Sequence, residues 1–118
     1  KANSNAADNC TALLTETAQW LHDMLDPALV LTVLESTSRL YEDSAPDRSA
    51  RLLAAAHAQR AANQTPPLPY ERRALETFEV RLAVRLGDDT FAAARNAGGE
   101  LSMAAALVEA EALLGNEP

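Results

Sequence analysis

Apolar residues recur three and four positions apart in several stretches of this chain, which is the spacing of one face of an α-helix. In the first stretch, Leu14, Ala18, Leu21 and Leu25 follow this spacing. The predicted helices cover about residues 8–25, 47–62, 69–86 and 90–97, with one more after Asp26 and a last one after Ser102. The pattern therefore predicts about six helices.

Proline and glycine mark the boundaries of these predicted helices. The prolines that begin a helical pattern are Pro27, Pro46 and Pro69. Proline is tolerated there because its missing N–H needs no partner in the first turn of a helix. The proline-rich run 63–68 is predicted to be a connector. Gly87 is expected to end one helix, and Gly98-Gly99 to close the short helix after it.

Composition supports the helical interpretation. Apolar residues make up 47% of the chain, yet aromatic residues make up only 4%, and isoleucine is absent. A chain so poor in β-branched and aromatic residues disfavours any sizeable sheet. The second and third predicted helices form a hairpin of about 34 residues, the length of a tetratricopeptide unit. We therefore predict an all-α fold of antiparallel hairpins, a tetratricopeptide-like array with a C-terminal helical cap.

The length of 118 residues suits one hydrophobic core. Residues 1–7 are expected to be disordered or left over from cloning, and residues 8–64 to form the tetratricopeptide-like helices. Residues 65–69 are the expected connector, and residues 70–118 the C-terminal helical cap of the same domain. Because no initiating methionine is present, we expect the chain to be a piece cut from a longer protein.

The net charge and the single cysteine indicate which partners and which cell compartment to expect. The net charge is −7, whereas a nucleic-acid-binding module normally carries a basic face, so direct nucleic-acid binding is not expected. The lone Cys10 cannot form an internal disulfide, which favours a reducing compartment. No apolar run approaches the ~20 residues needed to cross a bilayer. We therefore expect a cytoplasmic protein with no membrane partner.

Several packing motifs follow one another along the middle and end of the chain. They are RSARLLAAA at 48–56, PPLP at 66–69, YER at 70–72, LGDDTFAAA at 86–94, then Gly98, Leu101-Ser102 and Ala105-Ala106. This order resembles the C-terminal region of bacterial LuxR-type and antibiotic-regulatory transcriptional regulators. Those proteins join a DNA-binding domain, a nucleotide-switched ATPase and tetratricopeptide-like repeats. The resemblance covers roughly residues 26–114.

The resemblance implies a non-catalytic regulatory module that biases a switch elsewhere in its parent chain. The family's ATP-binding and DNA-binding residues lie outside this segment, so no catalytic, cofactor-binding or metal-binding residue is carried over. The partner is expected to be protein, either other domains of the parent regulator or a second copy in a homodimer. Two positions depart from the family pattern: Ala105 replaces an acidic residue, and Arg95 replaces the usual Trp.

Two groups of residues are candidates for binding a protein partner. They are the apolar residues Leu13, Trp20 and Met24 on the first predicted helix, and the arginines Arg72, Arg81 and Arg85 on the helix over 69–86. Arg81 and Arg85 stand four residues apart, where like charges repel each other on a helix. This spacing indicates a carboxylate nearby, either within the domain or on another protein.

The alternative hypothesis is a small-molecule sensor. Its pocket would lie between the helices over 47–62 and 69–86, near Tyr41, His57 and Phe78. His57 stands on an alanine-lined face, where it is either a ligand-binding group or a polar residue that fills a gap in the packing. Asp88-Asp89 are read as helix-capping residues. No cofactor, metal site or enzyme activity is expected.

Overall fold

The computed structural model describes residues 10–16 and 27–115, and within these ranges it is helical where the sequence pattern predicts a helix. Residues 10–16 are helical, and the further helices are α2 (Pro27–Leu40), α3 (Pro46–Asn63), α4 (Pro69–Leu86), α5 (Asp88–Gly99) and α6 (Met103–Gly115). These described residues contain no strand. The all-α prediction is confirmed. None of the described helices is both long and apolar enough to cross a membrane.

Local sequence explains where the helices begin and end. The backbone N–H of Leu68 donates to Glu71 Oε1 at 3.0 Å just before α4, which satisfies a donor that the helix itself leaves free. Gly87 ends α4 with a φ of 85°, a backbone conformation that favours glycine. Ser102 Oγ accepts a hydrogen bond of 3.0 Å from the Ala105 N–H and caps α6 as predicted.

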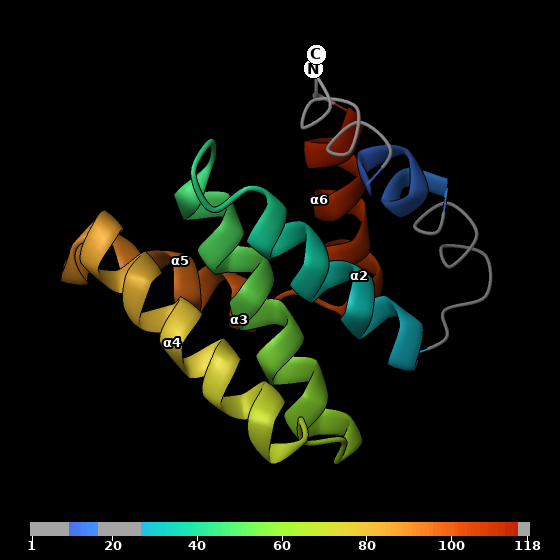
Figure 1. The fold of residues 1–118 in the computed structure, drawn as a ribbon, viewed down its shortest axis with the longest axis horizontal. Coiled ribbons are helices and arrows are strands. Elements are labelled where there is room, and N and C mark those ends of the chain that lie inside the picture. Colours follow the sequence, from blue (N-terminus) through green and yellow to red (C-terminus); the bar gives the residue numbers. More distant parts are fainter. Residues whose placement is uncertain (1–9, 17–26, 116–118) are drawn as a thin grey trace.

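Helix α3 lies at the centre of the molecule. Figure 1 shows α2, α3 and α4 side by side, with each running opposite to the one before it. Helix α5 then crosses α3, and α6 returns to pack against α2 and α3. In an open repeat array each unit touches only its neighbours. Here the last helix of the chain contacts the first complete helix, so the described part of the chain closes on itself.

Two hydrophobic clusters lie on opposite sides of α3. The first joins α2, α3 and α6 through Val30, Leu31, Val33, Leu34, Tyr41, Leu52, Ala55, Ala56, Ala106, Leu107, Ala110, Leu113 and Leu114. The second joins α3 and α4 through Ala50, Leu53, Phe78 and Leu82, with Phe91 of α5 packed against it. The sequence predicts only the stripe that contains Ala50 and Leu53. Because α3 is central, Leu52, Ala55 and Ala56 form a second buried stripe.

The end of α5 differs from the prediction. Gly98 and Gly99 were expected to close this helix after Ala97, but the helix continues through Gly98 and ends at Gly99. Gly98 is buried, and a Cβ placed on it would overlap the carbonyl oxygen of Arg51 and crowd Ala54 on α3. The glycine at position 98 therefore serves the close crossing of α5 over α3, and it does not terminate the helix.

Buried hydrogen bonds join the elements around the first cluster. Ser38 Oγ donates to the Ser49 carbonyl at 2.7 Å, and Ser49 Oγ donates to the Ser38 carbonyl at 2.6 Å. This reciprocal pair ties α2 to the first turn of α3. The Tyr41 hydroxyl donates to the Leu113 carbonyl at 3.0 Å and so joins the end of α2 to α6.

A candidate interaction groove beside helix α3

Two adjoining hollows follow the side of α3 that faces α4 and α5. The first, of about 140 Å³, lies between α3, the proline connector and α4, where Leu53, Pro67, Arg72 and Leu75 are among its lining residues. The second, of about 150 Å³, lies between α3, α4 and α5, and Phe91 lines it. Leu53, His57 and Glu79 line both hollows. We call the two hollows together the His57 groove.

The first hollow of the groove lies beside the part of α4 that precedes its buried contacts with α3. Phe78 and Leu82 hold α4 against α3 in the second cluster, and both are buried. The prolines of the connector prevent that segment from continuing the helix. Leu75, one turn before Phe78, is only partly buried and forms part of the groove wall. His57 is exposed, so it is not the packing residue of an alanine-lined core.

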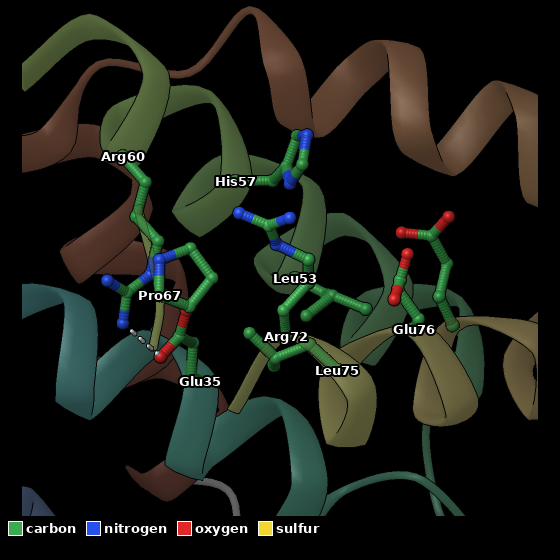
Figure 2. Close-up of a pocket in the computed structure, with 9 residues that line it drawn as sticks. Glu35, Leu53, His57, Arg60, Pro67, Arg72, Leu75 and Glu76 are labelled. Carbon is green, nitrogen blue, oxygen red and sulfur yellow. Dashed lines mark hydrogen bonds and ion pairs between the residues drawn. The ribbon is translucent and has the colours of Figure 1, made fainter. Parts of the chain in front are cut away.

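Charged groups lie at different ends of an apolar floor. Figure 2 shows the Arg72 guanidinium next to His57, with Leu53 and Leu75 beneath it and Glu76 at the far side. Arg72 forms no ion pair with any residue that the structure describes. On the α5 side of the groove, the Arg95 guanidinium lies over the Phe91 ring at 5.7 Å from its centroid. The floor is therefore apolar, with a cationic edge and an acidic edge.

A fixed ion pair forms the wall at the connector. Arg60 Nε and Nη2 donate to the two carboxylate oxygens of Glu35 at 2.8 and 2.9 Å, and both side chains are largely buried. Arg60 Nη1 also donates to the Thr65 carbonyl at 3.0 Å. The hydrogen bonds to Glu35 raise the pKa of Arg60 further above its ordinary value. Arg60 therefore holds the connector in place and has little capacity left for a ligand.

The structure supplies the carboxylates that the spacing of Arg81 and Arg85 indicates. Arg81 binds Glu42 through two hydrogen bonds of 2.9 and 3.1 Å, and Arg85 binds Asp43 at 2.8 Å. The hydrogen bonds from Arg81 lower the pKa of Glu42. Both arginines thus tie α4 to the turn after α2. Of the three predicted arginines, only Arg72 lines the groove.

The apolar partner-binding residues of the first predicted helix are only partly described. Leu13 is 64% exposed, while its neighbour Leu14 packs against the first hydrophobic cluster. Trp20 and Met24 lie outside the described residues. The partner-binding surface predicted on this helix therefore stays a prediction.

The three residues predicted for a sensor pocket do not meet. Tyr41 is buried in the first cluster, and Phe78 is buried in the second, on the other side of α3. Only His57 lines a hollow between α3 and α4. The separation follows from α3 being buried on two sides, which the single predicted stripe does not reveal. Leu53 and His57, four residues apart, were the sequence signal that could have located the groove.

Among residues 10–16 and 27–115, no group of three or more His, Cys, Asp or Glu side chains is arranged to hold a metal ion. Asp88 and Asp89 lie in the first turn of α5, where carboxylates interact favourably with the helix dipole. Comparison of the chain with protein-family models, curated proteins and solved structures gives no match.

Proposed function

We propose that this chain is a non-catalytic interaction module of a larger transcriptional regulator, and that the His57 groove binds a segment of a partner protein. The observation that carries the proposal is the pair of adjoining hollows over one apolar floor. Two neighbouring hollows on a helical surface suit a segment that inserts two side chains, as in helix-in-groove recognition.

The size of the hollows favours a protein partner over a metabolite. Small-molecule sites usually enclose ~300–1,000 Å³. The two hollows are each about half the lower limit or less, at about 140 and 150 Å³, and a further hollow on the connector side, which shares His57, Pro67 and Arg72, has about 270 Å³. A cavity of ~150 Å³ accommodates a group of about the size of benzene. Each hollow therefore suits one large apolar side chain of a partner.

The charged residues around the floor indicate which charges the partner segment should carry. Arg72 with His57 would meet a carboxylate at one end, and Glu76 with Glu79 would meet a basic group at the other. At the first hollow, the matching segment therefore carries an apolar anchor between an acidic and a basic residue. Charge complementarity of this kind selects the partner and its orientation more than it adds affinity.

Regulation follows from binding if the partner segment prefers one state of the parent protein. A ligand shifts a conformational equilibrium only as far as its affinity differs between the two states. A segment from another domain that reaches the groove in one state alone would stabilise that state. The module would then bias the switch without carrying any catalytic group itself.

Synthetic peptides test this proposal. We expect labelled peptides with a Leu or Phe between an Asp and a Lys to bind in fluorescence polarisation measurements, and peptides with Lys at both flanks to bind at least ~tenfold more weakly. Arg72→Glu should weaken binding of the first set by ~tenfold or more, because a charge-assisted hydrogen bond contributes ~1.5–3 kcal/mol. Arg73→Glu is the matched control, since Arg73 is the next residue of α4 and does not line the groove.

Two results would contradict the proposal. One is the absence of binding by any peptide of the first set. The other is binding that Arg72→Glu and Arg73→Glu reduce equally. A thermal-shift screen with metabolites separates the sensor alternative, because a ligand at 100 times its Kd stabilises the folded state by ~2.7 kcal/mol. A shift that Arg72→Glu removes, without any peptide binding, would favour the sensor.

A further inference from the structure

The outer face of α4, opposite the second hydrophobic cluster, carries an exposed apolar stripe. Val80 is 62% exposed and Val84 is 80% exposed, whereas Phe78 and Leu82 on the inner face are buried. Thr77 stands one turn before Val80 and belongs to the same outer face. Its hydroxyl donates to the Arg73 carbonyl at 2.9 Å, so it needs no outside hydrogen-bond partner. Thr77, Val80 and Val84 form the α4 stripe.

Exposed valines lower the stability of a helix, and little burial offsets this loss. A β-branched side chain loses rotamer freedom in a helix, and at these positions it gains little burial in return. Glu or Arg would favour the helix more at the same exposed positions. Val80 and Val84 form a small exposed apolar patch, and a partner that covers it would bury both side chains.

The charges along α4 indicate what covers it. Arg81 and Arg85, which flank the stripe, are engaged by Glu42 and Asp43 and so contribute little free charge. Among the described residues, neither Arg73 at the start of the stripe nor Asp88 just beyond its end forms an ion pair. Both are exposed. In chain order, a basic residue of α4 is therefore followed by the apolar stripe and then by an acidic residue at the start of α5.

This order is complementary to itself when reversed. We propose that the α4 stripe binds a second copy of the chain, with the two α4 helices antiparallel about a twofold axis. The arrangement brings Arg73 of each copy to the end of the partner helix where Asp88 lies, and it covers the valines between the two pairs. A parallel arrangement would instead bring like charges together. The stripe faces away from the second cluster, so the dimer does not depend on the His57 groove.

The proposed interface is small, so we expect the dimer to be weak. Standard complexes bury ~800 Å² on each partner, and a single helix face supplies a limited part of such an area. We expect a Kd on the order of 100 µM, measurable by sedimentation equilibrium over a concentration series. Val84→Glu should leave the chain folded by circular dichroism, because Val84 is 80% exposed, and should leave it monomeric throughout the series.

Charge reversal tests the antiparallel geometry. Arg73→Asp and Asp88→Arg should each weaken self-association, because each places like charges at both ends of the interface. An equimolar mixture of the two variants should associate at least as well as the original chain, since both end pairs are then opposite in sign. Arg72→Asp is the control, because Arg72 lies beside the His57 groove, and it should leave the dimer unchanged.

Three results would overturn the proposal: an original chain that is monomeric at 1 mM, a dimer that Val84→Glu does not weaken, or variants that do not associate better when mixed. Loss of peptide binding in Arg72→Glu with an unchanged dimer would support the groove and the α4 stripe as separate sites. A dimer that forms while no peptide binds would support this inference and contradict only the proposed groove function.

Discussion

Gly98 is the residue at which the packing leaves least room, because it lies where α5 crosses the backbone of α3. We predict that Gly98→Ala lowers the free energy of unfolding by ~1–3 kcal/mol or more, since the added methyl group overlaps the Arg51 carbonyl. Gly99→Ala is the control, as open space surrounds the next position of the same helix, and it should be neutral or stabilise by up to ~1 kcal/mol. Urea denaturation of both variants measures the difference. Equal effects would contradict the close crossing.

The serine pair gives a second prediction at the scale of single residues. Ser49→Ala leaves Ser38 in a buried site without the hydroxyl that donates to its carbonyl, so we expect a loss of ~1–3 kcal/mol in stability. The double variant Ser38→Ala/Ser49→Ala should cost less than the sum of the single changes, because the two hydroxyls interact with each other. Additive losses in urea denaturation would show that the pair is not coupled. Sequence alone did not reveal this pair, since serine near a helix start is more often a cap.

Among the elements, the turn after α2 depends on its carboxylates. The hydrogen bonds from Arg81 hold the pKa of Glu42 below its ordinary value. A depressed pKa means that Glu42 contributes stability above its unfolded pKa of ~4.3, and that this contribution is lost as the pH falls through the lower folded pKa. We predict that Glu42→Gln reduces the fall in stability between about pH 5 and pH 3. Denaturation curves over this range check it, and an unchanged slope would contradict the pairing.

Helix boundaries were predictable where local chemistry decides them and less so where packing does. The bounds of α4 agree with the prediction because Pro69 can only begin a helix and Gly87 adopts a positive φ. The predicted end of α5 at Ala97 was wrong because Gly98 serves a contact with a distant part of the chain. The alternative hypothesis did place a pocket between α3 and α4 near His57, but Tyr41 and Phe78, which it also named, do not line the His57 groove. The groove is lined by side chains of three helices, and the local spacing of apolar residues does not predict which helices pack together.

At the scale of the whole molecule, the return of α6 to α2 decides the architecture. The all-α class followed from composition and spacing, whereas this long-range contact had no signal in either. The Tyr41 hydroxyl donates a hydrogen bond to the Leu113 carbonyl across this contact. We predict that Tyr41→Phe lowers stability by ~1 kcal/mol, because it leaves a carbonyl of α6 without its donor. Thermal unfolding should show a lower Tm for this variant. An unchanged Tm would mean that the hydroxyl adds nothing to the closure of the fold.

The central claim is that the His57 groove is the binding surface of this module, and amide chemical shifts test it most directly. The ¹⁵N-labelled chain is titrated with the tightest-binding peptide that has a Leu or Phe between an Asp and a Lys. We expect the largest shift changes at Leu53, His57, Leu75 and Phe91, with little change in α6. Largest changes in α2 and α6, with the four groove residues unmoved, would contradict it.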